Sequence, residues 1–282
     1  MAAAFPSEEP LTEQRGQRFA RSWLPTPYRQ ELAYRVVGDG QPVVCLHGLW
    51  NSSAVWQRAL ETFSPQYRLY APDLPGHGRT PAHLPWRMRE VAALLATWMR
   101  SLEMPPATVV GHSMGGALAI MLAAAEPQLV DRLVLVNSIG LPIQRPFLRS
   151  LTRAGLGFAD RQKARYTSRY SKPSRLQSLA IWQATDEVLT CDLRPELRAI
   201  RCPTMIIWGI RDPLLPTHTA IALQCFIQGA ELVMLPNVRH HPSRQAPAAF
   251  DLILGDFLDR WQAEQAPASI SMPFAPNADA NP

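Results

Sequence analysis

Ser113 is the residue whose neighbours most clearly favour chemistry. It lies in the stretch Gly111-His112-Ser113-Met114-Gly115, between a β-branched apolar run and a run of good helix formers. A serine on a sharp strand-to-helix turn needs neighbours without Cβ atoms two residues to either side, and this spacing supplies both glycines. Such a turn exposes the hydroxyl and directs the free N–H groups of the helix N-terminus at the reacting atoms. The pattern predicts a nucleophilic serine.

A nucleophilic serine requires three kinds of helper. A base must accept its proton, an acid must orient that base, and hydrogen-bond donors must stabilise the oxyanion that forms on the substrate. These groups come from distant parts of the chain. The elements that bring them together therefore have to be predicted as well.

Short apolar segments alternate with helical segments on both sides of this turn. The segments predicted as further strands are 28–37, 42–48, 67–74, 132–137, 203–209 and 231–235. The first of them alternates loosely and predicts an antiparallel edge strand. Alternation of strands and helices is typical of a parallel sheet covered by helices on both faces. We expect an α/β fold with a doubly wound, mostly parallel sheet of about eight strands.

The alternation stops after Gly140 for roughly 55 residues and then resumes. Such a break predicts a helical cap inserted over the carboxyl ends of the strands, where open α/β sheets bind ligands. The expected divisions are a mobile N-terminal segment (1–17), a core in two parts (18–140 and 201–264), the cap between them (141–200) and a disordered tail (265–282).

The composition narrows the function classes. Hydrophobic residues make up 47% of the 282, enough for a large core, and no apolar run is as long as a membrane span. The N-terminus has no basic and apolar leader, and the four cysteines are scattered without metal-ligand spacing. We expect a cytoplasmic protein with free thiols, no metal and no cofactor.

The net charge of +5 is concentrated in the predicted cap. Residues 141–180 contain nine basic residues against Asp160 alone, which gives that segment +8. No nucleic-acid-binding module accompanies this charge, so we expect no nucleic-acid partner. Apolar residues interleave with the arginines, as in a helix lying on an anionic membrane or in a pocket roof with a solvated outer face. Both interpretations stay open, and the first makes the protein membrane-peripheral. The sequence does not determine the oligomeric state.

Five motifs, in chain order, resemble those of the α/β-hydrolase superfamily, in its serine hydrolase (esterase- and lipase-like) branch with a short cap. They are His47-Gly48-Leu49-Trp50, Asp73-Leu74-Pro75-Gly76-His77-Gly78-Arg79, Gly111-His112-Ser113-Met114-Gly115-Gly116, Trp208-Gly209-Ile210-Arg211-Asp212 and His240-His241-Pro242. The resemblance covers nearly all of residues 28–262. It implies a catalytic triad in the chain order Ser, Asp, His.

The resemblance places the acid after the strand that follows the cap or after the strand that precedes it. The earlier strand ends at Val136-Asn137-Ser138, with no carboxylate. The later one is followed by Asp212, so we expect Asp212 to orient the base.

Two adjacent histidines compete for the role of base. The α/β-hydrolase superfamily usually has prolines two and seven residues after the histidine that acts as base. Counting from His240 finds Pro242 and Pro247, whereas counting from His241 finds neither, so His240 is the expected base. Two departures from the family pattern are Arg239, in place of a glycine, and Gln245, in place of a glutamate.

The resemblance assigns the oxyanion donors to the backbone N–H groups of Leu49 and Met114. Backbone donors need no reorganisation during the reaction. Trp50, His112 and His241 are the residues that we expect near the substrate pocket, with His112 packed beneath the turn.

The expected reaction is acyl transfer to Ser113 followed by hydrolysis of the acyl-enzyme. A small-molecule carboxylic ester with a lipophilic group is the expected substrate, because esters are the commonest substrates in the resembled family. Carbon–carbon bond, thioester and peptide hydrolysis would use the same triad and stay open. A different class also stays open, in which a protein of this fold binds without hydrolysing, as do accessory proteins of chelatase steps in pigment biosynthesis.

Overall fold

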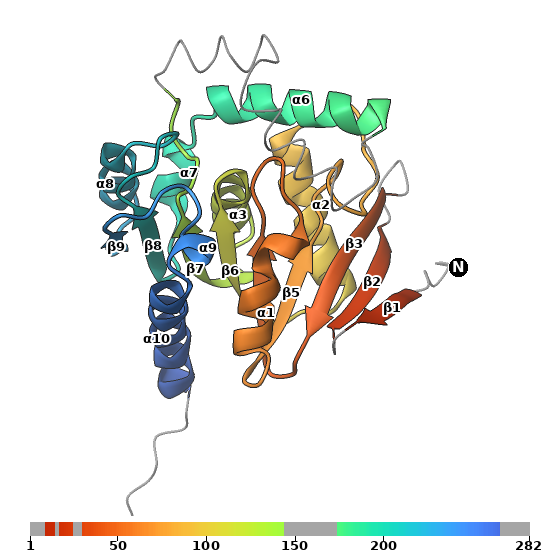
Figure 1. Ribbon diagram of the computed structural model, residues 1–282, viewed down its shortest axis with the longest axis horizontal. Helices are drawn as coiled ribbons and strands as arrows, with labels where there is room; N and C mark the ends of the chain where they lie inside the picture. Colours follow the sequence, from red (N-terminus) through yellow and green to blue (C-terminus); the bar gives the residue numbers. More distant parts are fainter. Residues whose placement is uncertain (1–8, 15–16, 25–29, 144–173, 266–282) are drawn as a thin grey trace, which may run out of the picture.

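A nine-stranded sheet forms the centre of the computed structural model, which describes residues 9–14, 17–24, 30–143 and 174–265 (Figure 1). The strands are, in their order across the sheet, β1 (Glu9–Gln14), β2 (Gln17–Leu24), β3 (Gln30–Val37), β5 (Tyr67–Pro72), β4 (Gln41–Leu46), β6 (Ala107–His112), β7 (Val130–Val136), β8 (Thr204–Gly209) and β9 (Glu231–Leu235). The first three neighbouring pairs are antiparallel, and from β5 to β9 every neighbouring pair is parallel. The expected doubly wound, mostly parallel architecture is confirmed.

The N-terminal hairpin differs from the prediction. β1 lies within residues 1–17, where the sequence predicts a mobile segment, and it pairs with β2. Because β2 in turn pairs with β3, the strand predicted for the edge lies inside the sheet. β1 is polar and has no alternating apolar pattern from which a strand could be predicted. It is held by backbone hydrogen bonds to β2, which do not depend on such a pattern.

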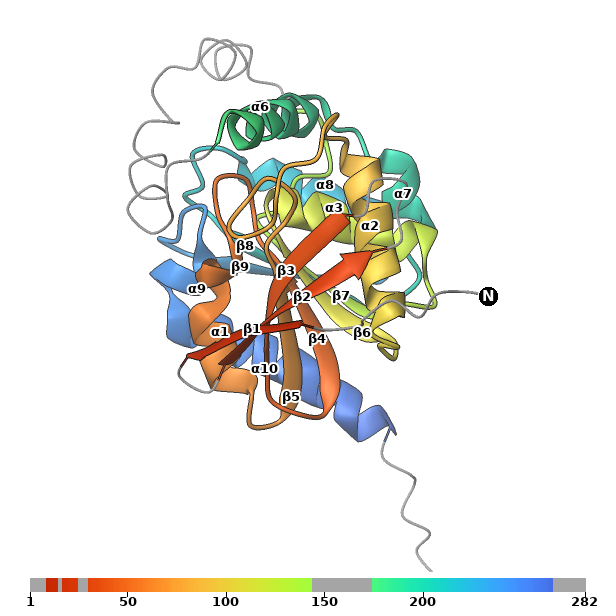
Figure 2. The same cartoon turned by 90° about the vertical axis from the view of Figure 1, so that its right-hand side faces the viewer.

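The central strands are buried on both faces. In β7, Leu133 and Leu135 pack into one core layer, while Val134 and Val136 pack into the other. The first layer is covered by α2 (Met88–Ser101), α3 (Met114–Ala125), α7 (Arg194–Ala199) and α8 (Thr217–Phe226). The second is covered by η1 (Ser53–Trp56), α1 (Gln57–Phe63) and α10 (Pro247–Gln265), while the short α9 (Pro242–Gln245) precedes α10. Figure 2 shows α1 and α2 on opposite sides of the sheet.

The strand order places two loops side by side. β4 lies between β5 and β6, so the connection after β4 leads to the neighbouring strand on one side, β5, and the chain later returns to form the neighbour on the other side, β6. Loops that follow such neighbouring parallel strands open into the same crevice. In the β4–β6 pairing Leu46 is opposite Gly111, so the segment after Leu46 runs beside the turn at Ser113.

One described helix of the predicted cap, α6 (Arg175–Thr190), lies across an end of the sheet (Figure 1). It is fixed to the core through the segment before α2: the Trp86 N–H donates to Gln183 Oε1 over 2.7 Å, and the Met88 N–H donates to Glu187 Oε2 over 2.8 Å. Glu187 thereby supplies the N-terminus of α2 with a carboxylate acceptor, which the N-cap residue Arg87 does not provide. Residues 144–173, which carry most of the predicted cap's arginines, lie outside the described part.

Candidate active site

Ser113 lies at the apex of the turn between β6 and α3, with φ +54° and ψ −116°. Non-glycine residues rarely adopt this conformation, and such strain is characteristic of functional sites. The strain is permitted by close packing around the turn. A Cβ on Gly111 would lie 2.5 Å from the Gly115 carbonyl oxygen, and one on Gly115 would lie 2.6 Å from the His47 carbonyl oxygen. Both glycines of the motif are therefore required sterically.

His240 and Asp212 meet Ser113 at this apex. The Nε2 atom of His240 lies 3.1 Å from the Ser113 Oγ, and its Nδ1 atom lies 2.7 Å from the Asp212 Oδ2. A carboxylate only accepts, so Nδ1 carries the proton and Nε2 is free to accept from the serine hydroxyl. The three residues come from loops after β6, β8 and β9, and all three side chains are largely buried.

The Asp212 carboxylate is held by several donors. Its Oδ1 accepts from the N–H groups of Leu214, over 2.8 Å, and Leu215, over 3.1 Å. Burial by itself raises the pKa of this carboxyl, but the hydrogen bond and the charge of His240, together with the two amides, outweigh burial and hold the pKa below its usual value. Asp212 is therefore ionised at neutral pH.

Asn137 is a site residue that the sequence did not predict. It follows β7 in the left-handed region, with φ +39°, and is fully buried. Its Nδ2 donates to the Asp212 Oδ2 over 2.6 Å, and its Oδ1 accepts from the Gly209 N–H over 2.9 Å. One feature of the sequence could have indicated Asn137: it follows the strand before the cap, where the resemblance allows the acid as an alternative.

The loop after β4 is fixed by His47. The Leu74 N–H donates to His47 Nε2 over 2.9 Å, so the proton is on Nδ1, which donates to the Gly48 carbonyl over 2.8 Å. Burial lowers the pKa of His47 to about 4, which keeps the ring neutral. A Cβ on Gly48 would lie 3.0 Å from the Ser113 Cβ, so the loop packs against Ser113. The Leu49 and Met114 amides therefore both belong to segments that adjoin Ser113.

The three predicted pocket residues have different environments. Trp50 is half-buried, with φ +60°, directly after Leu49. His112 is only 3% exposed, and its ring centroid lies 4.9 Å from that of His240 and 4.8 Å from that of His241. His112 thus packs against the rings of both histidines, and His241 is half-buried.

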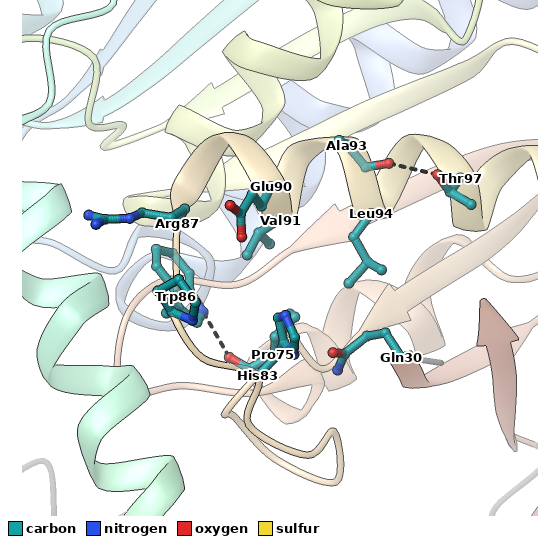
Figure 3. A pocket seen from close by; sticks show the side chains of 11 residues that line it. Gln30, Pro75, His83, Trp86, Arg87, Glu90, Val91, Ala93, Leu94 and Thr97 are labelled. Atoms are coloured by element: carbon teal, nitrogen blue, oxygen red, sulfur yellow. Dashed lines mark hydrogen bonds between the residues drawn. The ribbon is translucent and has the colours of Figure 1, made fainter. Parts of the chain in front are cut away.

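Two cavities among the described residues lie away from these groups. One, of about 420 Å³, is lined from α2 and the loop before it, and there the Trp86 Nε1–H donates to the Pro75 carbonyl over 3.0 Å (Figure 3). The other, of about 530 Å³, lies between Ile143 and α8. Neither is lined by a residue of the Ser113 cluster.

Within the described ranges, no cluster of histidine, cysteine or carboxylate side chains could hold a metal ion. None of the helices in those ranges is long and apolar enough to span a bilayer. All four cysteines are free, as expected.

Comparison with known proteins shows which family this chain is similar to. Residues 43–251 match the model of the alpha/beta hydrolase family. A pimeloyl-[acyl-carrier protein] methyl ester esterase of Nitrosospira multiformis is 29% identical, with 76% of this chain and 93% of that protein covered. A 2-hydroxy-6-oxo-6-(2'-aminophenyl)hexa-2,4-dienoic acid hydrolase of Metapseudomonas resinovorans is 26% identical, with 82% and 88% covered.

The chain also resembles solved structures in its fold. The enol-lactonase from Burkholderia xenovorans LB400 aligns with a TM-score of 0.71 at 21% identity, covering 85% of this chain and 99% of that one. At this identity the likeness concerns the fold alone. Because the matched segment runs from β4 into α10 and includes the elbow at Ser113, the chain belongs to the alpha/beta hydrolase family.

Proposed function

We propose that the chain is a serine hydrolase that cleaves a small carboxylic ester with a lipophilic group through an acyl-enzyme. The observation that carries the proposal is the continuous chain of contacts from Ser113 Oγ through the His240 ring to Asp212, with separations of 3.1 Å and 2.7 Å. A serine hydroxyl is a weak nucleophile unless an adjacent base accepts its proton. His240 is in position to do so, and Asp212 stabilises the imidazolium that forms.

In the first half of the reaction, Ser113 Oγ bonds to the carbonyl carbon of the ester while its proton passes to His240 Nε2. The carbonyl oxygen becomes negative and is stabilised by the Leu49 and Met114 amides, each donor of this kind contributing about 3 kcal/mol. The bond to the leaving alkoxy group then breaks. The alcohol departs with the proton from His240, and the acyl group stays on Ser113.

In the second half, water takes the place of the alcohol. His240 accepts a proton from the water as its oxygen attacks the acyl carbon, and a second oxyanion forms at the same donors. The bond to Ser113 breaks, the serine oxygen recovers the proton from His240, and the carboxylic acid is released. The triad is then as it began.

Relatives support an ester and keep one further reaction in view. The Nitrosospira relative is named for a methyl ester, and this favours the ester reading. The Metapseudomonas relative is named for hydrolysis of a dienoic acid, and it supports carbon–carbon bond cleavage as the second candidate. Thioesters and peptides use the same triad, so a substrate series has to include them.

A fluorophosphonate probe tests the proposed nucleophile directly. We expect the probe to label the wild type and not Ser113→Ala. Ser101→Ala is the matched control, because Ser101 lies in α2 and its hydroxyl donates only to the Trp98 carbonyl. An unlabelled wild type would favour a binding protein without hydrolytic activity. A chain-length series of p-nitrophenyl esters, with a thioester and an anilide of equal length, then gives the substrate class.

We further propose that the cap contacts an anionic membrane surface. Leu176, Leu179 and Trp182 follow one another on α6 at helical spacing and are 58%, 45% and 51% exposed. The +8 charge of residues 141–180 complements anionic lipid.

Co-sedimentation with anionic and neutral vesicles tests this contact. We expect Trp182→Ser to weaken retention on anionic vesicles. Leu252→Ser is the control, because Leu252 on α10 is even more exposed, at 74%. Retention on neither kind of vesicle would favour the pocket-roof interpretation.

A further inference from the structure

The main chain of His240 is held on both sides by side chains that do not touch the reacting atoms. The His112 Nε2 lies 2.7 Å from the His240 carbonyl oxygen. The N–H groups of the two flanking residues, Arg239 and His241, both donate to the Oε1 of Gln245, over 3.0 Å and 3.3 Å. We propose that His112 and Gln245 are positioning residues that set where the His240 ring stands between Ser113 and Asp212. This inference rests on the proposed function.

The contact with the carbonyl fixes the tautomer of His112. A carbonyl oxygen only accepts, so the proton must be on Nε2. The other nitrogen, Nδ1, is buried with no acceptor among the described residues, and a Cβ on Gly48 would lie 3.0 Å from it. A second proton on Nδ1 would be a buried donor without a partner, which is costly. His112 is therefore a neutral donor, singly protonated.

Neutrality of His112 matters because of what it faces. Burial, followed by the proximity of His240 and His241, lowers the pKa of His112 well below its usual value. A charged ring here would oppose the arrival of a proton on His240, whose ring centroid is 4.9 Å away. As a neutral donor, His112 holds the base without weakening it.

Gln245 holds the other side of the base and is also neutral. Its amide oxygen binds the N–H groups before and after His240, which prevents the loop from rotating about that residue. A carboxylate at this position would make the same two hydrogen bonds but would add a negative charge near the base. Among the described residues, the titratable and charged groups around His240 are Asp212, His112 and His241, with Arg211 and Arg239 on the adjoining loops and Arg244 in α9.

Paired variants separate positioning from mere packing. His112→Gln keeps an N–H that can reach the carbonyl, whereas His112→Phe keeps a ring of similar size without a donor. We expect kcat for a p-nitrophenyl ester to stay near the wild-type value in the first and to fall about 10-fold to 100-fold in the second, because misplacement of a catalytic group by about 1 Å has that effect. KM should change little in either. Leu60→Ala, a core change in α1, is the control for lost stability alone.

Gln245 gives a second pair of variants at an exposed position, where folding is not at risk. We expect Gln245→Ala to lower kcat about 3-fold to 10-fold, because the N–H groups of Arg239 and His241 lose their shared acceptor at a position where water can partly replace it. Gln245→Glu should keep kcat at high pH but move the acidic limb of the kcat/KM profile to higher pH, because a carboxylate favours the protonated imidazole. A loss of kcat in Gln245→Ala that Gln245→Glu restores at high pH indicates positioning, because the added charge by itself would move only the limb.

A readout without turnover completes the test. Two-bond ¹H–¹⁵N spectra of the histidine-labelled protein should show His112 as the Nε2–H tautomer, without titration from about pH 5 to about pH 9. Wild-type kcat in folded His112→Phe and in Gln245→Ala, or an Nδ1–H tautomer at His112, would overturn the inference. A wild type that neither hydrolyses esters nor reacts with fluorophosphonate would overturn the proposed function, and positioning of a base would fall with it.

Discussion

Asn137 and His240 bind the same oxygen of Asp212: the Asn137 Nδ2 lies 2.6 Å and the His240 Nδ1 2.7 Å from Oδ2. The side chain that ends β7 thus fixes the carboxylate that follows β8. Because Asn137 also accepts from the Gly209 N–H, it links the ends of both strands beside Asp212.

Removal of the Asn137 side-chain amide should displace the Asp212 carboxylate without unfolding the protein. We expect Asn137→Leu to lower kcat for ester hydrolysis about 10-fold, since a buried carboxylate loses a donor and the Gly209 N–H loses its acceptor. Asn137→Asp should be at least as harmful, because two carboxylates would then face each other. Steady-state kinetics with thermal melts would show this, and an Asn137→Leu protein with wild-type kcat would contradict it.

Buried histidines should make stability depend on pH. Burial lowers the pKa of His47 to about 4; burial and then His47 lower that of His77 to about 3, against an ordinary value of 6.5. The unfolded chain binds protons first as the pH falls, so the stability present above about pH 6.5 is lost toward pH 4, at up to about 1.4 kcal/mol per pH unit for each ring. Urea unfolding at several pH values measures the slope. His77→Gln should make it shallower, and a flat profile for the wild type would refute the account.

Glu187 should stabilise α2 from the cap. We expect Glu187→Ala to lower the free energy of unfolding by about 1 kcal/mol, because the Met88 N–H loses a charged acceptor at a helix N-terminus. Glu126→Ala is a matched control, since its side chain is equally exposed, at 25%, and pairs with Arg100 at the surface. The control should lose no more than about 0.5 kcal/mol. Equal losses in the two variants would show that Glu187 acts only as a surface ion pair.

Two glycine substitutions should have opposite effects. A Cβ at Gly115 would meet the backbone oxygens of Leu46 and His47, so Gly115→Ala should cost several kcal/mol or abolish folding. Gly255 lies inside α10, where a Cβ would meet only the Phe63 ring at 3.4 Å. There alanine should stabilise by about 0.5 to 1 kcal/mol. Thermal melts of the two proteins decide the matter, and a well-folded, active Gly115→Ala would be the result that contradicts the steric argument.

The sequence predicted what depends on local pattern. The alternation of apolar and helical segments predicts the parallel core, because strands buried on both faces are apolar throughout, whereas apolar residues recur about every three to four positions in a helix. The Gly111–Gly115 spacing reports the elbow, because only glycine permits that approach. Resemblance to a family was needed to choose Asp212 and to separate His240 from His241.

The hydrogen bonds of the supporting residues could not be predicted in this way, although His112 was expected beneath the turn and Gln245 was noted as a departure from the family pattern. Asn137, His112 and Gln245 act through hydrogen bonds to backbone or carboxylate groups on other loops, and an amide or an imidazole at a strand end has no spacing that announces such a partner. The β1–β2 hairpin was missed for a related reason, because its pairing uses backbone groups that every sequence carries.

β7 pairs directly with β8, from Leu133 opposite Thr204 to Val136 opposite Ile207, although the whole predicted cap lies between them in the chain. Because β7 and β8 are parallel, the chain leaves the carboxyl end of β7 and enters β8 at the opposite edge of the sheet, and α6 and α7 lie in this connection. None of the described strands of the sheet comes from it. In the part of the chain that the structure describes, Asp212 and Ser113 make their hydrogen bonds with residues of the core. Segments of different length or chemistry can thus be exchanged between β7 and α7 during evolution, and the chain can acquire a new substrate while the groups around Ser113 are inherited unchanged.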